Sequence, residues 1–243
     1  MTWTKKEICS FVDLTSLNSF DSPKSVKVFL DDALSFEKKG FPVAAVCLYP
    51  NFAPQAVEVL KDTSIKVAVV SGNFPNSQGF LATKLNECSL AIDAGADEID
   101  IVLNLGEFED KNYDHVVNEI KAFKGIMPNK TLKVILETGY LKSSEKIRLA
   151  AEMAIEGGAD FIKTSTGKEF PGATKEAVEV MAKLIAEYKE KRTVGLKISG
   201  GVKTYEDALG YFKMIEMYLG KDYMTPENLR IGASSLVRNL MND

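Results

Sequence analysis

The stretch that decides the fold is GADFIKTSTGK at residues 158–168, together with its partial repeat GADEIDIVLN at residues 95–104. In both, a glycine ends a helical pattern, Ala-Asp follows, and a short apolar run then has the composition of a buried strand. The third residue after the aspartate is charged in each, Asp100 in one and Lys163 in the other. The two runs lie about two strand–helix units apart, and alternate strands of a barrel contribute to one interior layer. We therefore expect Asp100 and Lys163 to face each other inside a barrel mouth.

Six similar apolar runs are spread along the rest of the chain. They are CSFVDLT from Cys9, VAAVCLY from Val43, KVAVVSG from Lys66, KVILETG from Lys133, GLKISGG from Gly195 and RIGASS from Arg230. Amphipathic segments separate them. Several carry helix signals: Ser22 with Pro23 as a start, Thr174 as a start, and Thr204 with Asp207 as a capping box ended by Gly220.

Eight strands alternating with helices in 243 residues predict an α/β fold, a single (β/α)8 TIM barrel over residues 1–243. A doubly wound parallel sheet is the alternative. No GxGxxG follows the first strand, which disfavours the dinucleotide-binding form of that sheet.

The composition excludes several classes of protein. A net charge of −4 argues against nucleic acid as a partner. Three widely spaced cysteines indicate a reducing, cytoplasmic location. The N-terminal residues lack the apolar run of a signal peptide. No run of about 18 apolar residues predicts a membrane-spanning segment. With His115 as the only histidine, a histidine-rich metal site or a Ser-His-Asp triad has no material, so we expect neither metal nor cofactor.

Two lysines lie in apolar strands, where a charged amine is costly unless it is paired or neutralised. Burial and a neighbouring cation both lower a lysine pKa, and a neutral amine can attack a carbonyl to form a Schiff base. Lys163 and Lys197 stand on consecutive strands, so each could hold the other neutral. Two simpler interpretations stay open: Lys163 as a lysine paired with a carboxylate, and Lys197 as a phosphate ligand.

Two acids and one cysteine belong to the same interior. Asp100 could relay protons or form an ion pair with a lysine, and these roles are compatible. Asp13 is a similar buried acid that could orient a loop or a lysine. Cys47 is interpreted as a small wall residue, because no histidine is available to activate its thiol.

Glycine-rich turns follow the last three strands, where barrels frequently bind phosphate through backbone N–H groups. The candidate phosphate-binding residues are Gly167, Lys168, Gly200, Gly201, Ser234 and Ser235, with a helix expected to begin near Ser234. Each turn alone is a weak signal. Their coincidence at one barrel end predicts a local anion pocket.

These motifs together resemble the deoxyribose-phosphate aldolase family. The resemblance rests on GADEIDIVLN, LKVILETG, GADFIKTSTGK, TVGLKISGGV and RIGASSL, with FVDLTSLN, AAVCLYP and NFP, and runs from about Phe11 to Leu236. It implies a metal-free class I aldolase that reversibly cleaves 2-deoxy-D-ribose 5-phosphate to D-glyceraldehyde 3-phosphate and acetaldehyde, a step of deoxyribose phosphate catabolism.

The resemblance also implies roles for individual residues. Lys163 corresponds to the Schiff-base lysine, Lys197 to the second lysine that perturbs it, and Asp100 to the proton-relay acid. Asp13 is a supporting polar residue, and Thr164 and Cys47 fall on the wall of the substrate pocket. The glycines, serines and Lys168 named above fall where the family binds phosphate.

The chain departs from the family pattern at two places. Ile198-Ser199 stands where many members have Pro-Ala or another pair of small residues. The mobile tail with a terminal tyrosine that some members have is not matched, since the sequence reads to Asp243. Apolar helix faces lead us to expect a homodimer.

Three other functions remain open at this point. A Schiff-base aldolase for another phosphorylated sugar is the nearest. A non-catalytic barrel that binds a sugar phosphate is the second. The third is a metal-dependent lyase, which one histidine disfavours.

Overall fold

In the computed structural model, which describes residues 3–242, eight parallel strands form a closed barrel in chain order, and β8 pairs with β1 to complete it. This confirms the predicted (β/α)8 TIM barrel. The strands are β1 (Val12–Thr15), β2 (Ala45–Leu48), β3 (Lys66–Val70), β4 (Glu98–Val102), β5 (Thr131–Ile135), β6 (Phe161–Lys163), β7 (Gly195–Ser199) and β8 (Leu229–Ala233).

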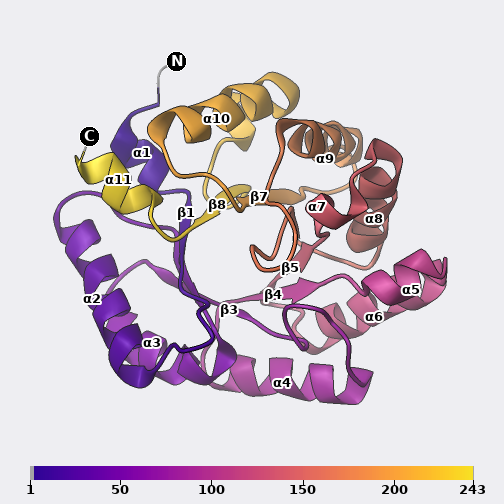
Figure 1. The fold of residues 1–243 in the computed structure, drawn as a ribbon, viewed down its shortest axis with the longest axis horizontal. Helices are drawn as coiled ribbons and strands as arrows, with labels where there is room; N and C mark the ends of the chain where they lie inside the picture. Colours follow the sequence, from indigo (N-terminus) through magenta and orange to yellow (C-terminus); the bar gives the residue numbers. More distant parts are fainter. Residues whose placement is uncertain (1–2, 243) are drawn as a thin grey trace.

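Helices surround the strands as an outer ring, and α1 and α11, the first and last helices of the described residues, lie side by side (Figure 1). The α-helices are α1 (Lys5–Cys9), α2 (Pro23–Lys38), α3 (Ala53–Leu60), α4 (Leu81–Asp93), α5 (Leu105–Glu109), α6 (Tyr113–Ile126), α7 (Thr138–Leu141), α8 (Ser144–Glu156), α9 (Lys175–Tyr188), α10 (Tyr205–Leu219) and α11 (Leu236–Asn242). Two short 3-10 helices are η1 (Pro50–Phe52) and η2 (Lys221–Tyr223). Within residues 3–242, no helix is both long and apolar enough to cross a bilayer.

The predicted helix ends are mostly confirmed. Ser22 and Thr174 cap α2 and α9 through their side chains, and Thr204 forms a capping box with Asp207 at the start of α10. One boundary was wrong, because the run from Cys9 begins as the end of helix α1, which its own capping box at Thr4 initiates. The helix expected near Ser234 is present and begins at Leu236.

Side chains alternate along each strand between the barrel interior and the layer that packs against the helices. Residues of one parity, such as Val46 and Ile162, pack outward in the large apolar core shared with the helices. Residues of the other parity point inward. Small apolar side chains gather on β2 and β3, namely Ala45, Cys47, Ala68 and Val70, while β1 and β4 to β8 contribute charged ones.

The ring of Phe161 lies inside the barrel beside the charged residues. Gly195 makes room for it, because a Cβ atom at this position would lie 2.4 Å from the ring of Phe161. The guanidinium of Arg230 lies over that ring, 5.8 Å from its centroid. Lys163 approaches solvent at the carboxyl-terminal end of the strands, where a cavity opens.

Candidate active site

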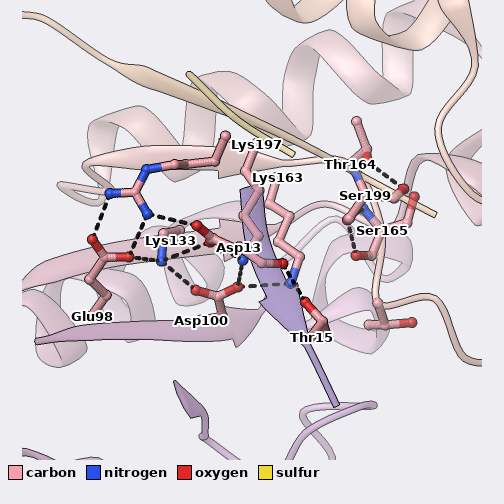
Figure 2. Close-up of polar contacts among 12 residues, drawn as sticks. Asp13, Thr15, Glu98, Asp100, Lys133, Lys163, Thr164, Ser165, Lys197 and Ser199 are labelled. Carbon is pink, nitrogen blue, oxygen red and sulfur yellow. Dashed lines mark hydrogen bonds and ion pairs between the residues drawn. The ribbon is translucent and has the colours of Figure 1, made fainter. Parts of the chain in front are cut away.

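Asp100 stands at the centre of a buried group of charged side chains (Figure 2). Its Oδ2 accepts hydrogen bonds from the Nζ atoms of Lys163 and Lys197, each at 2.8 Å, and its Oδ1 accepts one from Lys133 at 2.9 Å. The strands fix this meeting, because Lys163 pairs in register with Lys197, and Asp100 with Lys133. The expectation that Asp100 and Lys163 face each other is confirmed.

Two further carboxylates complete the group beneath Asp100. Asp13 lies 2.5 Å from Lys197 Nζ and 2.7 Å from Arg230 Nη1. Glu98 lies 2.6 Å from Lys133 Nζ and 2.8 Å from Arg230 Nη2. We call the seven residues the charge cluster: Asp13, Glu98, Asp100, Lys133, Lys163, Lys197 and Arg230. None of them is more than 6% exposed, so their charges interact in a medium of low dielectric constant.

Lys163 is the cation with the fewest partners in the charge cluster. Arg230 and Lys197 each contact two carboxylates, and Lys133 contacts Glu98 and Asp100 closely. Lys163 contacts only Asp100, at an oxygen that Lys197 shares. With four bases and three carboxylates, one positive charge has no counter-charge inside the cluster. Loss of the proton from Lys163 removes that excess.

The pKa values of the two lysines on β6 and β7 move in opposite directions. Burial lowers the pKa of Lys163, Asp100 opposes this, and the charge of Lys197 lowers it further. Burial also disfavours the charged form of Lys197, but Asp100 and Asp13 outweigh it and hold the pKa well above the ordinary value. The pKa of Asp100 lies well below its ordinary value, because Lys133, Lys163 and Lys197 outweigh the effect of burial. Of the two amines, that of Lys163 therefore loses its proton more readily, while Lys197 stays an ammonium beside the Asp100 carboxylate.

A cavity of about 240 Å³ opens at the carboxyl-terminal end of the barrel, with Lys163 in its wall. All six predicted phosphate-binding residues line it: Gly167, Lys168, Gly200, Gly201, Ser234 and Ser235. Lys203 adds a third lysine, while none of its lining residues, all within the described chain, is acidic. The cavity thus suits an anionic ligand that also reaches the Lys163 amine.

The glycines let the loops above β6 and β7 approach each other closely. A Cβ atom at Gly172 would lie 2.3 Å from the carbonyl oxygen of Gly200, so only glycine fits there without movement of the backbone. Gly200 and Gly201 have φ values of 83° and 95°, in the region that favours glycine. These positions shape the side of the cavity that holds backbone N–H groups.

Ile198-Ser199 stands where the resemblance leads us to expect a pair of small residues, and the contacts of Ser199 show how the structure accommodates this difference. Its Oγ donates to the carbonyl of Ser165 at 2.5 Å, and its backbone N–H donates to Thr164 Oγ1 at 3.0 Å. Ile198 points outward into the apolar core. The pair therefore ties the β7 end to the β6 loop and leaves the two following glycines free to line the cavity.

Glu137 supports the same loop from the end of β5. Its carboxylate is buried and accepts hydrogen bonds from the backbone N–H of Thr166 at 3.2 Å and from its hydroxyl at 2.5 Å. Burial raises the pKa of Glu137. Lys168, in the next turn, reaches across the mouth and donates to the carbonyl of Leu17.

Five predicted site residues do not line the cavity. Asp100 and Lys197 lie in the charge cluster behind Lys163. Asp13 is buried beneath it and pairs with Lys197 and Arg230. Thr164 is buried and tied to Ser199 through its hydroxyl. Cys47 belongs to the small apolar cluster inside the barrel, and burial raises the pKa of its thiol. Their contact with a substrate remains a prediction.

Glu98, Lys133 and Arg230 were not predicted as site residues, although each stands in an apolar run that was expected to be a strand. A signal was available for Glu98, which lies two residues before Asp100 and so shares its face. Lys133 and Arg230 are the first residues of their apolar runs, a position where a charge is ordinary at a strand end. Their inward direction depends on barrel register, which only the structure provides.

The chain is similar to known proteins over most of its length. A family model described as "DeoC/LacD family aldolase" matches residues 10–218. The chain is 36% identical to the deoxyribose-phosphate aldolase of Mus musculus and 35% identical to that of Homo sapiens. Each alignment covers 98% of this chain and 79% of the relative.

Solved structures show the same likeness. An aldolase named QR15 is 34% identical and superposes with a TM-score of 0.80 over 97% of this chain and 95% of that one. A tetrameric deoxyribose phosphate aldolase from Aeropyrum pernix, 24% identical, superposes with a TM-score of 0.79 over 98% and 92% of the two chains, which supports the fold.

Proposed function

Because the chain belongs to the DeoC/LacD family of aldolases, we propose that this aldolase cleaves 2-deoxy-D-ribose 5-phosphate reversibly, through a Schiff base on Lys163. The observation that carries the proposal is the cavity with Lys163 in its wall, Lys168 and Lys203 beside it, and no acidic lining residue among those described. A sugar phosphate satisfies both features, since its phosphate is anionic and its open-chain form presents an aldehyde.

The orientation of the substrate follows from the two parts of the cavity. The phosphate binds where Gly167, Lys168, Gly200, Gly201, Ser234 and Ser235 gather. C1 then lies toward Lys163 and the charge cluster. Thr164 and Cys47 lie behind this end of the pocket, and Asp13 holds Lys197 in place from below.

Cleavage begins when the neutral amine of Lys163 adds to the C1 carbonyl and water leaves. The resulting iminium draws electrons from the C2–C3 bond as the C3 hydroxyl loses its proton. D-Glyceraldehyde 3-phosphate departs, and the enamine that remains is protonated at C2 and hydrolysed to acetaldehyde. Asp100, an ionised carboxylate beside Lys163, relays protons through a water molecule, and Lys197 keeps the amine of Lys163 neutral between turnovers.

We expect the purified protein to cleave 2-deoxy-D-ribose 5-phosphate, detected by coupling either product to NADH oxidation. Lys163→Ala removes the nucleophile and abolishes turnover. Fructose 1,6-bisphosphate serves as the competing substrate: preferential cleavage of that sugar would place the chain with another Schiff-base aldolase activity. Loss of activity with EDTA would indicate a metal-dependent lyase.

A non-catalytic sugar-phosphate binder is the second possibility that the cavity allows. It would bind the ligand without turnover and would not be trapped on Lys163 by reduction. The depressed pKa of Lys163 favours the catalytic proposal, because simple phosphate binding needs the charged form of a lysine.

Three wider expectations accompany the proposal. We propose a role in deoxyribose phosphate catabolism and a cytoplasmic location, in keeping with three free, buried cysteines. The expected homodimer is tested by sedimentation analysis, where a monomer or tetramer would contradict it. Neither nucleic acid nor a membrane is proposed as a partner.

A further inference from the structure

We propose that Glu98 and Arg230 are positioning residues that set the protonation state of Lys163 through the charge count of the cluster. This inference rests on the proposed Schiff-base role of Lys163. Neither residue lines the cavity, so neither touches the substrate in this arrangement. Their contacts lead to Lys163 only through Asp13, Lys133, Lys197 and Asp100.

The contacts form a connected path. Arg230 donates to Glu98 through both terminal nitrogens, at 2.8 Å and 3.2 Å, and to Asp13 at 2.7 Å. Glu98 contacts Lys133 at 2.6 Å, and Asp13 contacts Lys197 at 2.5 Å. Lys133 and Lys197 both reach Asp100, the one carboxylate that Lys163 contacts. Apart from Lys163, the cluster holds three bases and three carboxylates, and each of these six groups contacts a group of opposite charge within the cluster.

The groups that face Lys163 from the surrounding elements are few. They are Asp100 on β4, Lys197 on β7, Cys47 on β2 and Glu137 after β5. Lys168 and Lys203 border the same cavity as Lys163, and the variants below leave both unchanged. The raised pKa values of Cys47 and Glu137 limit what these two contribute as negative charges. The charge state of Lys163 is thus governed by the balance of the cluster, which holds four bases against three carboxylates.

Substitutions at Glu98 and Arg230 change the balance of bases and carboxylates in the charge cluster in a predictable way. Arg230→Gln leaves three lysines against three carboxylates, so Lys163 can keep its proton in a neutral cluster. Glu98→Gln leaves four bases against two carboxylates, so the titration midpoint of Lys163 should not rise. The double variant leaves three lysines against two carboxylates, and its excess of one positive charge is that of the native cluster.

The test follows the titration of Lys163 without relying on aldol turnover. Cyanate carbamylates only neutral amines, and its rate at residue 163, measured by peptide mass spectrometry from pH 5 to pH 10, reports the midpoint. We expect Arg230→Gln to raise the midpoint by roughly half a pH unit or more. Glu98→Gln should not raise it, and the double variant should return it to the native position. Arg230→Lys, which keeps the charge, should leave the midpoint close to native.

Other outcomes are distinguishable. An unmoved midpoint in Arg230→Gln, or a raised midpoint in Glu98→Gln or in the double variant, overturns the charge-count inference. Repacking around residues 98 and 230 alone gives no reason for the second substitution to cancel the effect of the first. If Arg230→Gln does not fold, Arg230→Met takes its place, because it removes the same charge and should raise the midpoint by the same amount; an unmoved midpoint in Arg230→Met would overturn the inference equally. Should the native enzyme titrate and respond as expected yet fail to cleave 2-deoxy-D-ribose 5-phosphate, the proposed substrate is wrong while the inference stands.

Discussion

Lys163 and Lys197 are the same residue type on adjacent strands, in direct register, yet their pKa values are shifted in opposite directions. The difference comes from their partners. Lys197 lies between Asp13 and Asp100, whereas Lys163 shares one oxygen of Asp100 and borders the cavity. In the proposed mechanism, this unequal distribution of carboxylates makes the Lys163 amine the nucleophile.

Lys197→Leu should depress turnover strongly at neutral pH. Removing this cation leaves three bases against three carboxylates, so the pKa of Lys163 rises and the neutral fraction falls. The acid limb of the pH–rate profile should move to higher pH, with partial recovery of the rate in alkaline buffer. The control is Lys183→Leu, which removes an exposed lysine paired with Glu179. A normal pH–rate profile in Lys197→Leu would refute the perturbing role of Lys197.

At the scale of elements, the loops after β6, β7 and β8 convert barrel ends into a pocket. The glycines at these ends were visible in the sequence and gather as expected around one cavity. The close contact between Gly172 and Gly200 was not predictable, because it joins two loops whose separation depends on barrel curvature. The role of Ser199 as a link to Ser165 depends on the same approach.

Gly172→Ala should weaken substrate binding. The added methyl group would lie 2.3 Å from the Gly200 carbonyl oxygen, so one loop must move away from the other. Because this distorts the proposed phosphate site and leaves the charge cluster intact, we expect KM to rise about tenfold or more, an effect near 1.4 kcal/mol, with a smaller change in kcat.

The matched control for this variant is Gly125→Ala. Gly125 lies in α6, and a Cβ atom there meets nothing within 4 Å. Alanine should leave KM unchanged and stabilise the helix by up to about 1 kcal/mol. Equal KM values for Gly172→Ala and the native enzyme would show that the loop contact does not shape the binding site.

At the scale of the molecule, the closed barrel brings residues from six strands into one charge cluster. The sequence supported the barrel and the Asp100–Lys163 contact, since both follow from alternation and from the repeat at residues 95 and 158. It did not reveal how Lys133 and Arg230, together with Lys197, neutralise the three carboxylates. Those pairings join residues as far apart as Asp13 and Arg230, and only a closed sheet with fixed register determines them.

The charge cluster should make the stability of the fold depend on pH. The pKa values of Asp13 and Asp100 lie below their ordinary value of 3.8, so these ionised carboxylates stabilise the native state above that pH. This contribution is lost as the pH falls below 3.8 toward the native pKa values. Urea unfolding from pH 6 to pH 2 should show a steep loss of unfolding free energy at the acid end.

Asp100→Asn tests the origin of that loss. It leaves the surrounding lysines without their shared carboxylate and should lower the unfolding free energy by about 3–5 kcal/mol at pH 6. The acid dependence should also become shallower than in the native protein. Glu58→Gln, which alters an exposed pair with Lys61, is the control and should change neither quantity. An unchanged acid dependence in Asp100→Asn would place its origin elsewhere.

The central claim is that Lys163 forms the covalent intermediate, and reductive trapping tests it most directly. The protein is incubated with acetaldehyde, reduced with borohydride, digested and mapped by mass spectrometry, with Lys163→Ala as the control. We expect a single ethyl group on Lys163, loss of activity in proportion to its incorporation, and no modification at Lys197 or Lys133. An unmodified Lys163 in a preparation that still cleaves 2-deoxy-D-ribose 5-phosphate would contradict the account.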